Sequence, residues 1–549
     1  CAAVGDRLMS VGNWQRAQAL QALAAGEVFD LLIIGGGATG LGLAVDASAR
    51  GLRTALVEAQ DFAKGTSSRS TKLVHGGVRY PAQGRISLVR EALHERSTLL
   101  ANAPHLASAL PFILPCGGWV EKGFYGAGLK AYGALSGRRG LGPTEMLSAH
   151  QVRDAVPGIQ GDRHTGGWRY WDAQFDDARL AVALARTAQA QGAVLLNHCE
   201  VQALLREDSS PMAAVCGAQV QDHETGQSWR IGARCVVNAT GVWVDAVRRM
   251  GAAASTESSL PAMVSPSQGV HLVVDARFLG GHHALLVPRT SDGRVVFAVP
   301  WLGSVVLGTT DTPRDDLPLE PRAFAQEVDF ILQEAGRYLS RPLSRRDVRS
   351  VWVGLRPLVK PVGGESSTGA LSREHTVQVA SNGLVTVTGG KWTTYRTMAE
   401  DVLQACGQAG LLKALRPSST AALPLKGSPP SGPAGASPIT SPITRISEAP
   451  GLHLYGQDAE AVMALPGADH WLAPGLSEAM VRFAVRQEMA RTVEDVLARR
   501  SRLLFLDAAA AQAVAPRVAD LLVQERACSP LAAGLEPFRQ LAEQYARVP

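Results

Sequence analysis

The chain has no two cysteines at C-x-x-C spacing, and its seven cysteines are scattered among 549 residues. Disulfide frameworks and zinc sites use cysteines in even numbers or in closely spaced pairs, so this pattern argues against both. It favours a reducing compartment and cysteines that act as small buried hydrophobic residues. His282 and His283 are adjacent, but neighbouring side chains on a chain point apart, so we predict no metal site.

Long apolar runs are also missing. A membrane-spanning helix needs about 18 uninterrupted apolar residues. The stretch from Leu31 to Val45 is broken by glycines, and the stretch from Ala508 to Val523 is broken by charges and Pro516. The N-terminus has no basic start followed by an apolar segment, as a secretory signal would have. We expect any contact with a membrane to be peripheral.

Strong charge of either sign is absent. The net charge is +5, and no Lys/Arg run with interleaved aromatic residues occurs. This argues against a nucleic-acid-binding protein, because such proteins concentrate basic residues along one face. The mild excess of positive charge favours an anionic substrate or an anionic lipid surface.

The length of 549 residues exceeds what one hydrophobic core usually serves and predicts two or three domains. A short amphipathic lead-in over residues 1–26 precedes an apolar strand from Phe29 to Ile34. A small-residue helix from Gly40 to Arg50 and a strand from Thr54 to Glu58 complete a β-α-β unit. Further strands are predicted at 193–196, 235–238, 271–274, 294–299 and 384–388, with helices at 177–191 and 322–339.

Residues 417–450 are crowded with proline, serine and glycine, a composition that predicts a linker. Helical patterns at 481–504 and 508–523 predict an α-helical C-terminal domain. We expect Arg491, Arg499 and Arg500 to lie on its solvated surface, with contact to a partner or an acidic lipid as the alternative. The fold class that follows is α/β. It combines a Rossmann-like nucleotide-binding domain, an inserted antiparallel-sheet substrate domain and an α-helical C-terminal cap.

The strongest local motif is the G-x-G-x-x-G formed by Gly35, Gly37 and Gly40 after the first strand. In this motif the first glycine makes a tight turn, the second lets the backbone approach a pyrophosphate, and the third allows close packing of helix on strand. The pyrophosphate then lies at the positive N-terminus of the helix. Glu58 ends the second strand, where its carboxylate can accept both ribose hydroxyl groups.

Two later features favour FAD over NAD. The strand at 235–238 continues as Ala239-Thr240-Gly241, a turn that returns the chain past the first glycine loop in FAD domains. The final strand runs into Gly389, Gly390 and Lys391 before a helix. A helix N-terminus and a lysine there would stabilise the negative charge that reduced flavin develops.

A family signature is carried by five segments: 66–80 (TSSRSTKLVHGGVRY), 353–357 (VGLRP), 372–374 (SRE), 389–396 (GGKWTTYR) and 485–500 (VRQEMARTVEDVLARR). In this order they resemble the motifs of FAD-dependent glycerol-3-phosphate dehydrogenases, from about residue 27 to about residue 535. The segment Gly241-Val242-Trp243 departs from the usual Gly-Pro-Trp or Gly-Ala-Trp, and the linker is longer than in the family.

The resemblance implies the reaction and its setting: oxidation of sn-glycerol 3-phosphate to dihydroxyacetone phosphate, with FAD as cofactor and a quinone as electron acceptor. It further implies a protein that is often a homodimer and that is cytoplasmic, docked peripherally on the inner face of the cytoplasmic membrane. The implied FAD-binding segments are 27–85, 165–255 and 348–412. The substrate-domain segments are 86–164 and 256–347, and the C-terminal cap spans 451–549.

The substrate is a small dianion with a secondary alcohol, so its site needs cationic donors and a group that takes the hydroxyl proton. Arginine binds phosphate bidentately, and the family motifs point to Arg79, Arg356 and Arg373. Histidine is the usual base near neutral pH. His75 and His271 both match family positions, and the sequence does not distinguish them.

The remaining site residues follow from the family motifs. Tyr80 and Thr394 are expected to hydrogen-bond the substrate, and Lys391 to bind substrate or flavin, so that Lys391 and Arg356 join the two histidines as catalytic candidates. Contacts with the cofactor are expected from Ser67, Ser68, Lys72 and Val201.

Two other functions stay open at this stage. A glycerol-3-phosphate oxidase on the same scaffold would pass electrons to oxygen, and a flavin-containing binding protein would have no turnover. The sequence does not display access to flavin C4a, on which oxygen reactivity depends. The cationic cluster of His75, Arg79, Arg356 and Lys391 argues against the non-catalytic alternative.

Overall fold

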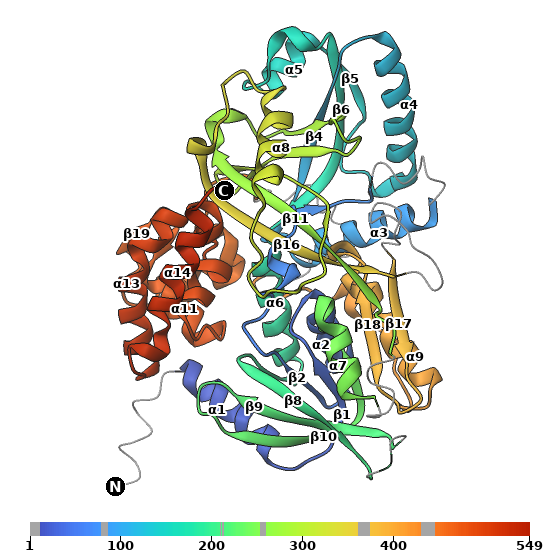
Figure 1. Ribbon diagram of the computed structural model, residues 1–549, viewed down its shortest axis with the longest axis vertical. Coiled ribbons are helices and arrows are strands. Elements are labelled where there is room, and N and C mark those ends of the chain that lie inside the picture. The colour runs from blue at the N-terminus through green and yellow to red at the C-terminus, as the bar shows by residue number, and fades with distance from the viewer. Residues whose placement is uncertain are drawn as a thin grey trace.

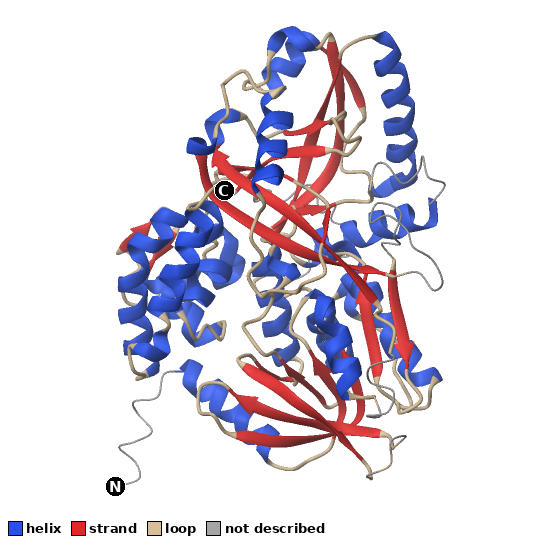
Figure 2. Ribbon diagram, in the orientation of Figure 1, coloured by secondary structure: helices blue, strands red, loops and turns tan. Residues whose placement is uncertain are grey.

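The computed structural model describes residues 11–77, 86–208, 210, 213–252, 260–360, 374–429 and 445–549. Two large β-sheets, each with helices packed on it, lie beside a helical C-terminal domain (Figure 1). Figure 2 shows that the strands are concentrated in the two sheet domains, whereas the C-terminal domain consists mainly of helices. This arrangement confirms the fold class predicted from the sequence.

An eight-stranded sheet contains the N-terminal β-α-β unit. Five strands run parallel in the order β18-β10-β1-β2-β7, a hairpin of β8 and β9 continues from β10, and β17 flanks β18. The strands are β1 (Phe29–Ile34), β2 (Thr54–Val57), β7 (Val194–Leu196), β8 (Cys199–Arg206), β9 (Val215–Asp222), β10 (Ser228–Asn238), β17 (His375–Val379) and β18 (Val385–Gly389).

Both faces of this sheet are covered, which explains why β1 is apolar along almost its whole length. Leu31 and Ile33 lie in one core and Leu32 and Ile34 in another, as expected from alternating side chains. The first core is shared with helices α2 (Ala38–Ala49), α6 (Asp177–Ala190) and α9 (Tyr395–Gln408). The second is shared with helices α1 (Val11–Ala24) and α7 (Val244–Met250) and with the β8–β9 hairpin.

A ten-stranded, mainly antiparallel sheet forms the second domain. Its strands are β3 (Leu73–Val74), β4 (Ala107–Cys116), β5 (Glu145–Ser148), β6 (Gly166–Phe175), β11 (Val264–Asp275), β12 (Ala284–Val287), β13 (Val296–Trp301), β14 (Ser304–Gly308), β15 (Thr312–Pro313) and β16 (Val348–Val359). Helices α5 (Ala149–Ala155) and α8 (Ala325–Gly336) pack on it, with α3 (Ile86–Asn102) and α4 (Trp119–Ser136) at one side (Figure 1).

All three predicted FAD-domain segments need correction. Strands β3, β6 and β16 belong to the ten-stranded sheet, although they fall in the predicted segments 27–85, 165–255 and 348–412. The reason is that a strand's partners lie far away in the sequence, so a local apolar pattern does not reveal which sheet the strand joins.

The C-terminal domain contains α10 (Ala459–Met463), a hairpin of β19 (Trp471–Ala473) and β20 (Leu476–Ser477), α11 (Glu478–Gln487), α12 (Leu503–Leu506), α13 (Ala508–Arg526) and α14 (Leu535–Ala546). The continuous helix predicted at 481–504 is therefore wrong. Met489 and Arg502 have left-handed backbone, with φ of 56° and 64°, and a π-helical turn spans Asp495–Arg500 between them. A helix cannot continue through such residues.

The interpretation of Arg491, Arg499 and Arg500 as a solvated surface is also wrong. These side chains belong to buried residues, with exposed fractions of 6%, 2% and 2%. Arg491 pairs with Glu224 of the loop after β9, and Arg499 and Arg500 both pair with Asp61 of the loop after β2. The C-terminal domain is thus joined to the FAD domain by buried ion pairs.

The predicted linker at 417–450 is docked at both of its described ends. Leu425 and Ile446 are buried, and the Ser428 hydroxyl donates to the carbonyl of Asn102 at 2.6 Å. Residues 430–444 lie outside the described ranges. Within those ranges, no helix has the length and apolar character needed to cross a membrane.

Candidate active site

A cavity of about 1080 Å³ lies between the two sheets. Loops at the carboxyl ends of the parallel strands line one side of it, and strands β11 and β16 line the other. Ligands of open α/β sheets bind outside the carboxyl ends of the strands, so the cavity lies where a cofactor is expected. Predicted site residues in its lining are Gly35, Gly37, Glu58, Ser67, His75, Val201, Gly241, His271, Arg356, Gly389, Gly390 and Lys391.

The glycine loop is shaped by close backbone contacts. Gly35 has φ of 110°, and a Cβ atom there would lie 2.7 Å from the carbonyl oxygen of Ala239. A Cβ at Gly40 would lie 1.9 Å from the carbonyl oxygen of Gly35, so α2 could not start as close to β1. Gly37 lines the cavity at the N-terminus of α2, as a pyrophosphate site requires.

Glu58 is held at the end of β2 by backbone amides. Its carboxylate accepts hydrogen bonds from the amides of Gly36 at 2.6 Å and Gln60 at 2.8 Å. Burial raises the pKa of Glu58, and these two amides oppose that change by stabilising the carboxylate. Glu58 and Val201 both line the cavity, and a carboxylate after the second strand of the unit suits the ribose of a dinucleotide.

The opposite end is formed by the segment after β2 and the turn after β18. The Ser67 hydroxyl accepts from the amide of Ala38 at 2.9 Å, and the Trp392 indole donates to the Ser67 carbonyl at 2.7 Å. Gly389 and Gly390 have φ of 81° and 74°, a backbone that favours glycine. Because these backbone segments line a long cavity with a pyrophosphate site at its middle, the residues present fit FAD.

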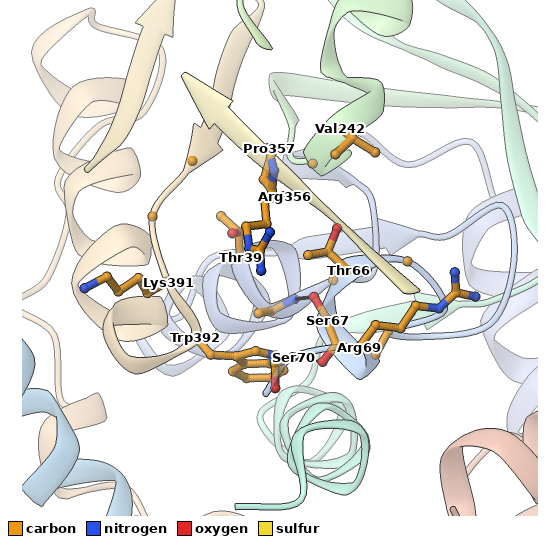
Figure 3. Close-up of a pocket in the computed structure, with 18 of the residues that line it drawn as sticks. Thr39, Thr66, Ser67, Arg69, Ser70, Val242, Arg356, Pro357, Lys391 and Trp392 are labelled. Atoms are coloured by element: carbon orange, nitrogen blue, oxygen red, sulfur yellow. Dashed lines mark hydrogen bonds between the residues drawn. The ribbon is translucent and has the colours of Figure 1, made fainter. Parts of the chain in front are cut away.

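Arg356 on β16 brings a positive charge to the cavity. Its guanidinium donates to the Thr309 hydroxyl at 3.1 Å and lies 3.5 Å from an Asp311 carboxylate oxygen. Figure 3 shows the side chain pointing towards the segment that carries Thr66 and Ser67. About a quarter (26%) of its side chain is exposed, so an anion could reach the guanidinium from the cavity.

His271 on β11 is almost completely buried but lines the cavity. Its Nε2 lies 2.9 Å from the Thr71 hydroxyl, and its ring stacks on Trp352 with centroids 4.1 Å apart. No described residue hydrogen-bonds its Nδ1. Burial lowers the pKa of His271 well below its usual range, and the charges of Lys72 and Arg356 lower it further.

His75 lines the same cavity, on a segment whose backbone is held by buried hydrogen bonds. The Gly76 amide donates to the Tyr132 hydroxyl at 2.9 Å, and that hydroxyl donates to Asp172 at 2.8 Å. Asp172 in turn pairs with Arg96 at 2.7 Å. This buried chain fixes the backbone next to His75 while its half-buried ring remains at the cavity.

Lys72, Ser68 and Thr394 occupy positions that differ from the expected contacts. Lys72 does not line the cavity: its ammonium donates to Asp177 and to the Ser68 carbonyl, both at 2.7 Å, and lies 4.4 Å from the Trp352 ring centroid. Ser68 and Thr394 are buried outside the lining.

Other predicted residues are placed only in part. The Lys391 side chain extends away from Arg356 in Figure 3, although its residue borders the cavity. Arg79, Tyr80 and Arg373 lie outside the described residues. Sequence reasoning did not single out Thr71, Thr309 and Asp311, which contact the histidine and the arginine. The polar run Thr309-Thr310-Asp311 directly after an apolar strand is the signal that could have found two of them.

Comparisons with known proteins agree with this geometry. The family model for FAD dependent oxidoreductases matches residues 30–396, and the model for the C-terminal domain of alpha-glycerophosphate oxidase matches residues 418–530. The mitochondrial glycerol-3-phosphate dehydrogenase of Macaca fascicularis is 40% identical over 521 residues, which cover 90% of this chain and 70% of the relative. The mitochondrial enzyme of Arabidopsis thaliana is 40% identical over 555 residues, covering 95% and 87% of the two chains.

Solved structures show the same fold. The glycerol-3-phosphate dehydrogenase from Bacillus halodurans complexed with FAD has a TM-score of 0.76 and 29% identity, covering 98% of this chain and 99% of the other. The L-alpha-glycerophosphate oxidase from Mycoplasma pneumoniae with bound FAD has a TM-score of 0.55 and 18% identity, covering 72% and 98%, and is alike in fold alone.

Proposed function

Because this chain belongs to the family of FAD-dependent glycerol-3-phosphate dehydrogenases and therefore binds FAD, we propose that it oxidises sn-glycerol 3-phosphate to dihydroxyacetone phosphate. The family and the cofactor agree with the predictions made from the sequence motifs. The observation that carries the proposal is Arg356, a cation that faces the same cavity as the dinucleotide loop, Ser67 and His271.

Each part of the chain has a distinct task in this reaction. The glycine loop and Glu58 hold the cofactor at its pyrophosphate and ribose. Arg356 binds the substrate phosphate, and Thr309 and Asp311 hold its guanidinium in place. His271 or His75 takes the proton from the secondary hydroxyl group. Bound FAD would supply the acceptor for the hydride that leaves the carbon bearing this hydroxyl.

The test is an anaerobic reduction. Purified protein is mixed with sn-glycerol 3-phosphate, and the absorption of oxidised flavin near 450 nm is followed. We expect bleaching with this substrate and none with glycerol or the opposite enantiomer. Flavin that stays oxidised with all three compounds would contradict the proposed substrate while leaving the cofactor in place.

For the electron acceptor we propose a quinone. Such an acceptor is apolar, and the exposed apolar residues of α4, described in the next paragraph, would bring the protein to the lipid phase that holds it. The match of residues 418–530 to an oxidase domain supports oxygen as the second candidate. Hydrogen peroxide formed per substrate oxidised separates them: a yield near one supports the oxidase, whereas a low yield with rapid reduction of a soluble quinone supports the dehydrogenase.

A peripheral membrane contact is proposed through α4. Its first turns expose Trp119, Val120 and Phe124 by 78%, 87% and 74%, and Lys130 is exposed further along the same helix. Aromatic and aliphatic residues next to basic ones are typical of helices that lie in a lipid interface. In Figure 1 this helix lies at the outer edge of the ten-stranded sheet, away from the C-terminal domain.

Replacing Trp119 and Phe124 with serine is expected to weaken binding to anionic phosphatidylglycerol vesicles by about tenfold or more, because each aromatic side chain buries apolar area on binding. Flotation with vesicles measures this. Trp471→Ser is the matched control, since Trp471 is also exposed but lies in the C-terminal domain. Unchanged flotation of the double variant would contradict the proposal, and a dimer that the variant dissociates would make α4 a subunit contact instead.

A further inference from the structure

A short segment of the C-terminal domain, residues 494–502, contacts both loops that build the cofactor cavity. We propose that this segment is a positioning element for FAD, so that docking of the C-terminal domain and retention of the cofactor are coupled. The proposal rests on FAD as the cofactor and is independent of the substrate. It gives a role to a segment that the family signature contains but that takes no part in the chemistry described above.

The first contact is at the adenine end of the cavity. The buried carboxylate of Asp61 accepts hydrogen bonds from the guanidinium groups of Arg499 and Arg500 and from the Asn197 amide. Asp61 is three residues after Glu58, and the loop that carries both returns to the glycine motif through a hydrogen bond from the Ala63 amide to the Gly36 carbonyl at 2.9 Å. Holding Asp61 therefore fixes the backbone on which Glu58 is presented.

Further ion pairs extend the first contact. His198 Nε2 lies 2.9 Å from an Asp495 carboxylate oxygen, and the His198 amide donates to the carbonyl of Gln60 at 2.7 Å. Lys64, which lines the cavity, pairs with Glu494 at 2.7 Å. The loop from Glu58 to Gly65 is thus held at Asp61 and at Lys64 by charged groups of the C-terminal domain.

The second contact is at the flavin end. Arg502 donates to the carbonyl of Ser68 at 2.8 Å and to the carboxylate of Asp177 at 3.1 Å. Asp177 also accepts from the Ser70 hydroxyl and from Lys72, both at 2.7 Å. Arg502 thus supports from behind the segment that presents Thr66, Ser67 and Ser70 to the cavity.

The local backbone explains how one segment reaches both ends. The π-helical turn at Asp495–Arg500 places Arg499 and Arg500 on the same carboxylate, and the left-handed conformation of Arg502 directs the chain towards Ser68. π-Helical turns are rare and are often found at functional sites. Every guanidinium concerned belongs to a residue that is at most 2% exposed, so each depends on its carboxylate partner for solvation.

The test measures FAD release from the intact holoenzyme. Arg499→Gln and Arg502→Gln are each expected to release FAD at least about tenfold faster than the unchanged protein after dilution, which is followed by the fluorescence of free flavin. Arg486→Gln is the matched control and should stay within about twofold, because Arg486 pairs with Glu525 inside the C-terminal domain.

A second comparison separates positioning from loss of stability. Leu541→Ala removes buried apolar volume from α14 and is expected to lower the thermal stability of the C-terminal domain without removing an ion pair to either loop. If it accelerates FAD release as much as Arg499→Gln does, the segment has no positioning role. The same conclusion follows if both glutamine variants fold and release FAD at the original rate. If either glutamine variant fails to fold, Arg499→Lys replaces it, because lysine keeps the charge but not the bidentate donors of the guanidinium. This variant is expected to release FAD about threefold faster than the unchanged protein. An unchanged rate would overturn the proposal.

Discussion

Replacing Arg356 with glutamine is expected to lower kcat/KM for sn-glycerol 3-phosphate by about a thousandfold. A bidentate, charge-assisted contact between guanidinium and phosphate contributes about 3–5 kcal/mol when it is sheltered from water, and each 1.4 kcal/mol corresponds to a factor of ten. Thr309 and Asp311 hold the guanidinium in the cavity, so little of this energy is spent on ordering the side chain. Arg356→Lys keeps the positive charge but not the bidentate geometry, and we expect it to lose less activity than Arg356→Gln.

Steady-state assays with a soluble quinone check this expectation. The matched control is Arg349→Gln on the same strand, because Arg349 is partly exposed and pairs with Asp275. A loss no larger than that of the control would show that the phosphate binds elsewhere.

His271→Asn is expected to lower kcat by about a thousandfold, the range that general-base catalysis supplies. His271 has the geometry of a base, because its Nε2 contacts the Thr71 hydroxyl and its Nδ1 has no partner among the described residues. His75→Asn is the comparison variant at the same cavity, and we expect a smaller loss. A larger loss for His75→Asn than for His271→Asn would make His75 the base.

The pH dependence gives an independent check. The neutral imidazole is the active form, and burial, together with the charges of Lys72 and Arg356, lowers the pKa of His271. The acid limb of kcat/KM, which reports the free enzyme, should therefore lie below the ordinary histidine value of about 6.5. A phosphate dianion at Arg356 offsets the positive charge nearby and raises the pKa in the complex. The acid limb of kcat should accordingly lie at higher pH than that of kcat/KM.

The β-α-β unit and its glycine loop could be predicted from the sequence, whereas the predicted cofactor contacts Ser68 and Lys72 do not line the cavity. The strand Phe29–Ile34 has the predicted bounds, and Gly35, Gly37 and Glu58 lie where the motif requires them. This success has a physical reason: a β-α-β unit is local, and the requirement for Gly40 comes from Gly35 within the same unit, although Gly35 itself also packs against the distant Ala239. Arg356 and His271 were predicted through family motifs, because no local pattern places a strand of one sheet opposite a loop of another.

The errors share one cause, which is long-range pairing. Arg499 and Arg500 look like a solvated helix face until Asp61, more than four hundred residues earlier, is placed beside them. Lys72 lies in a family motif and was expected to contact the flavin. Its ammonium is instead paired with Asp177 and packed on the Trp352 ring. Charged residues are normally exposed, and a sequence does not reveal which ones acquire a buried partner.

The strand order has a consequence for how the protein is made. Strand β1 needs β10 as its neighbour, β10 needs β18, and the loop after β2 needs Arg499 and Arg500. At about 5–20 residues per second, a ribosome delivers these partners tens of seconds after β1 has emerged. The first glycine loop therefore lacks these contacts, and the edges of β1 and β2 lack strand partners, until almost the entire chain has been synthesised. Cofactor capture is therefore expected only near the end of synthesis.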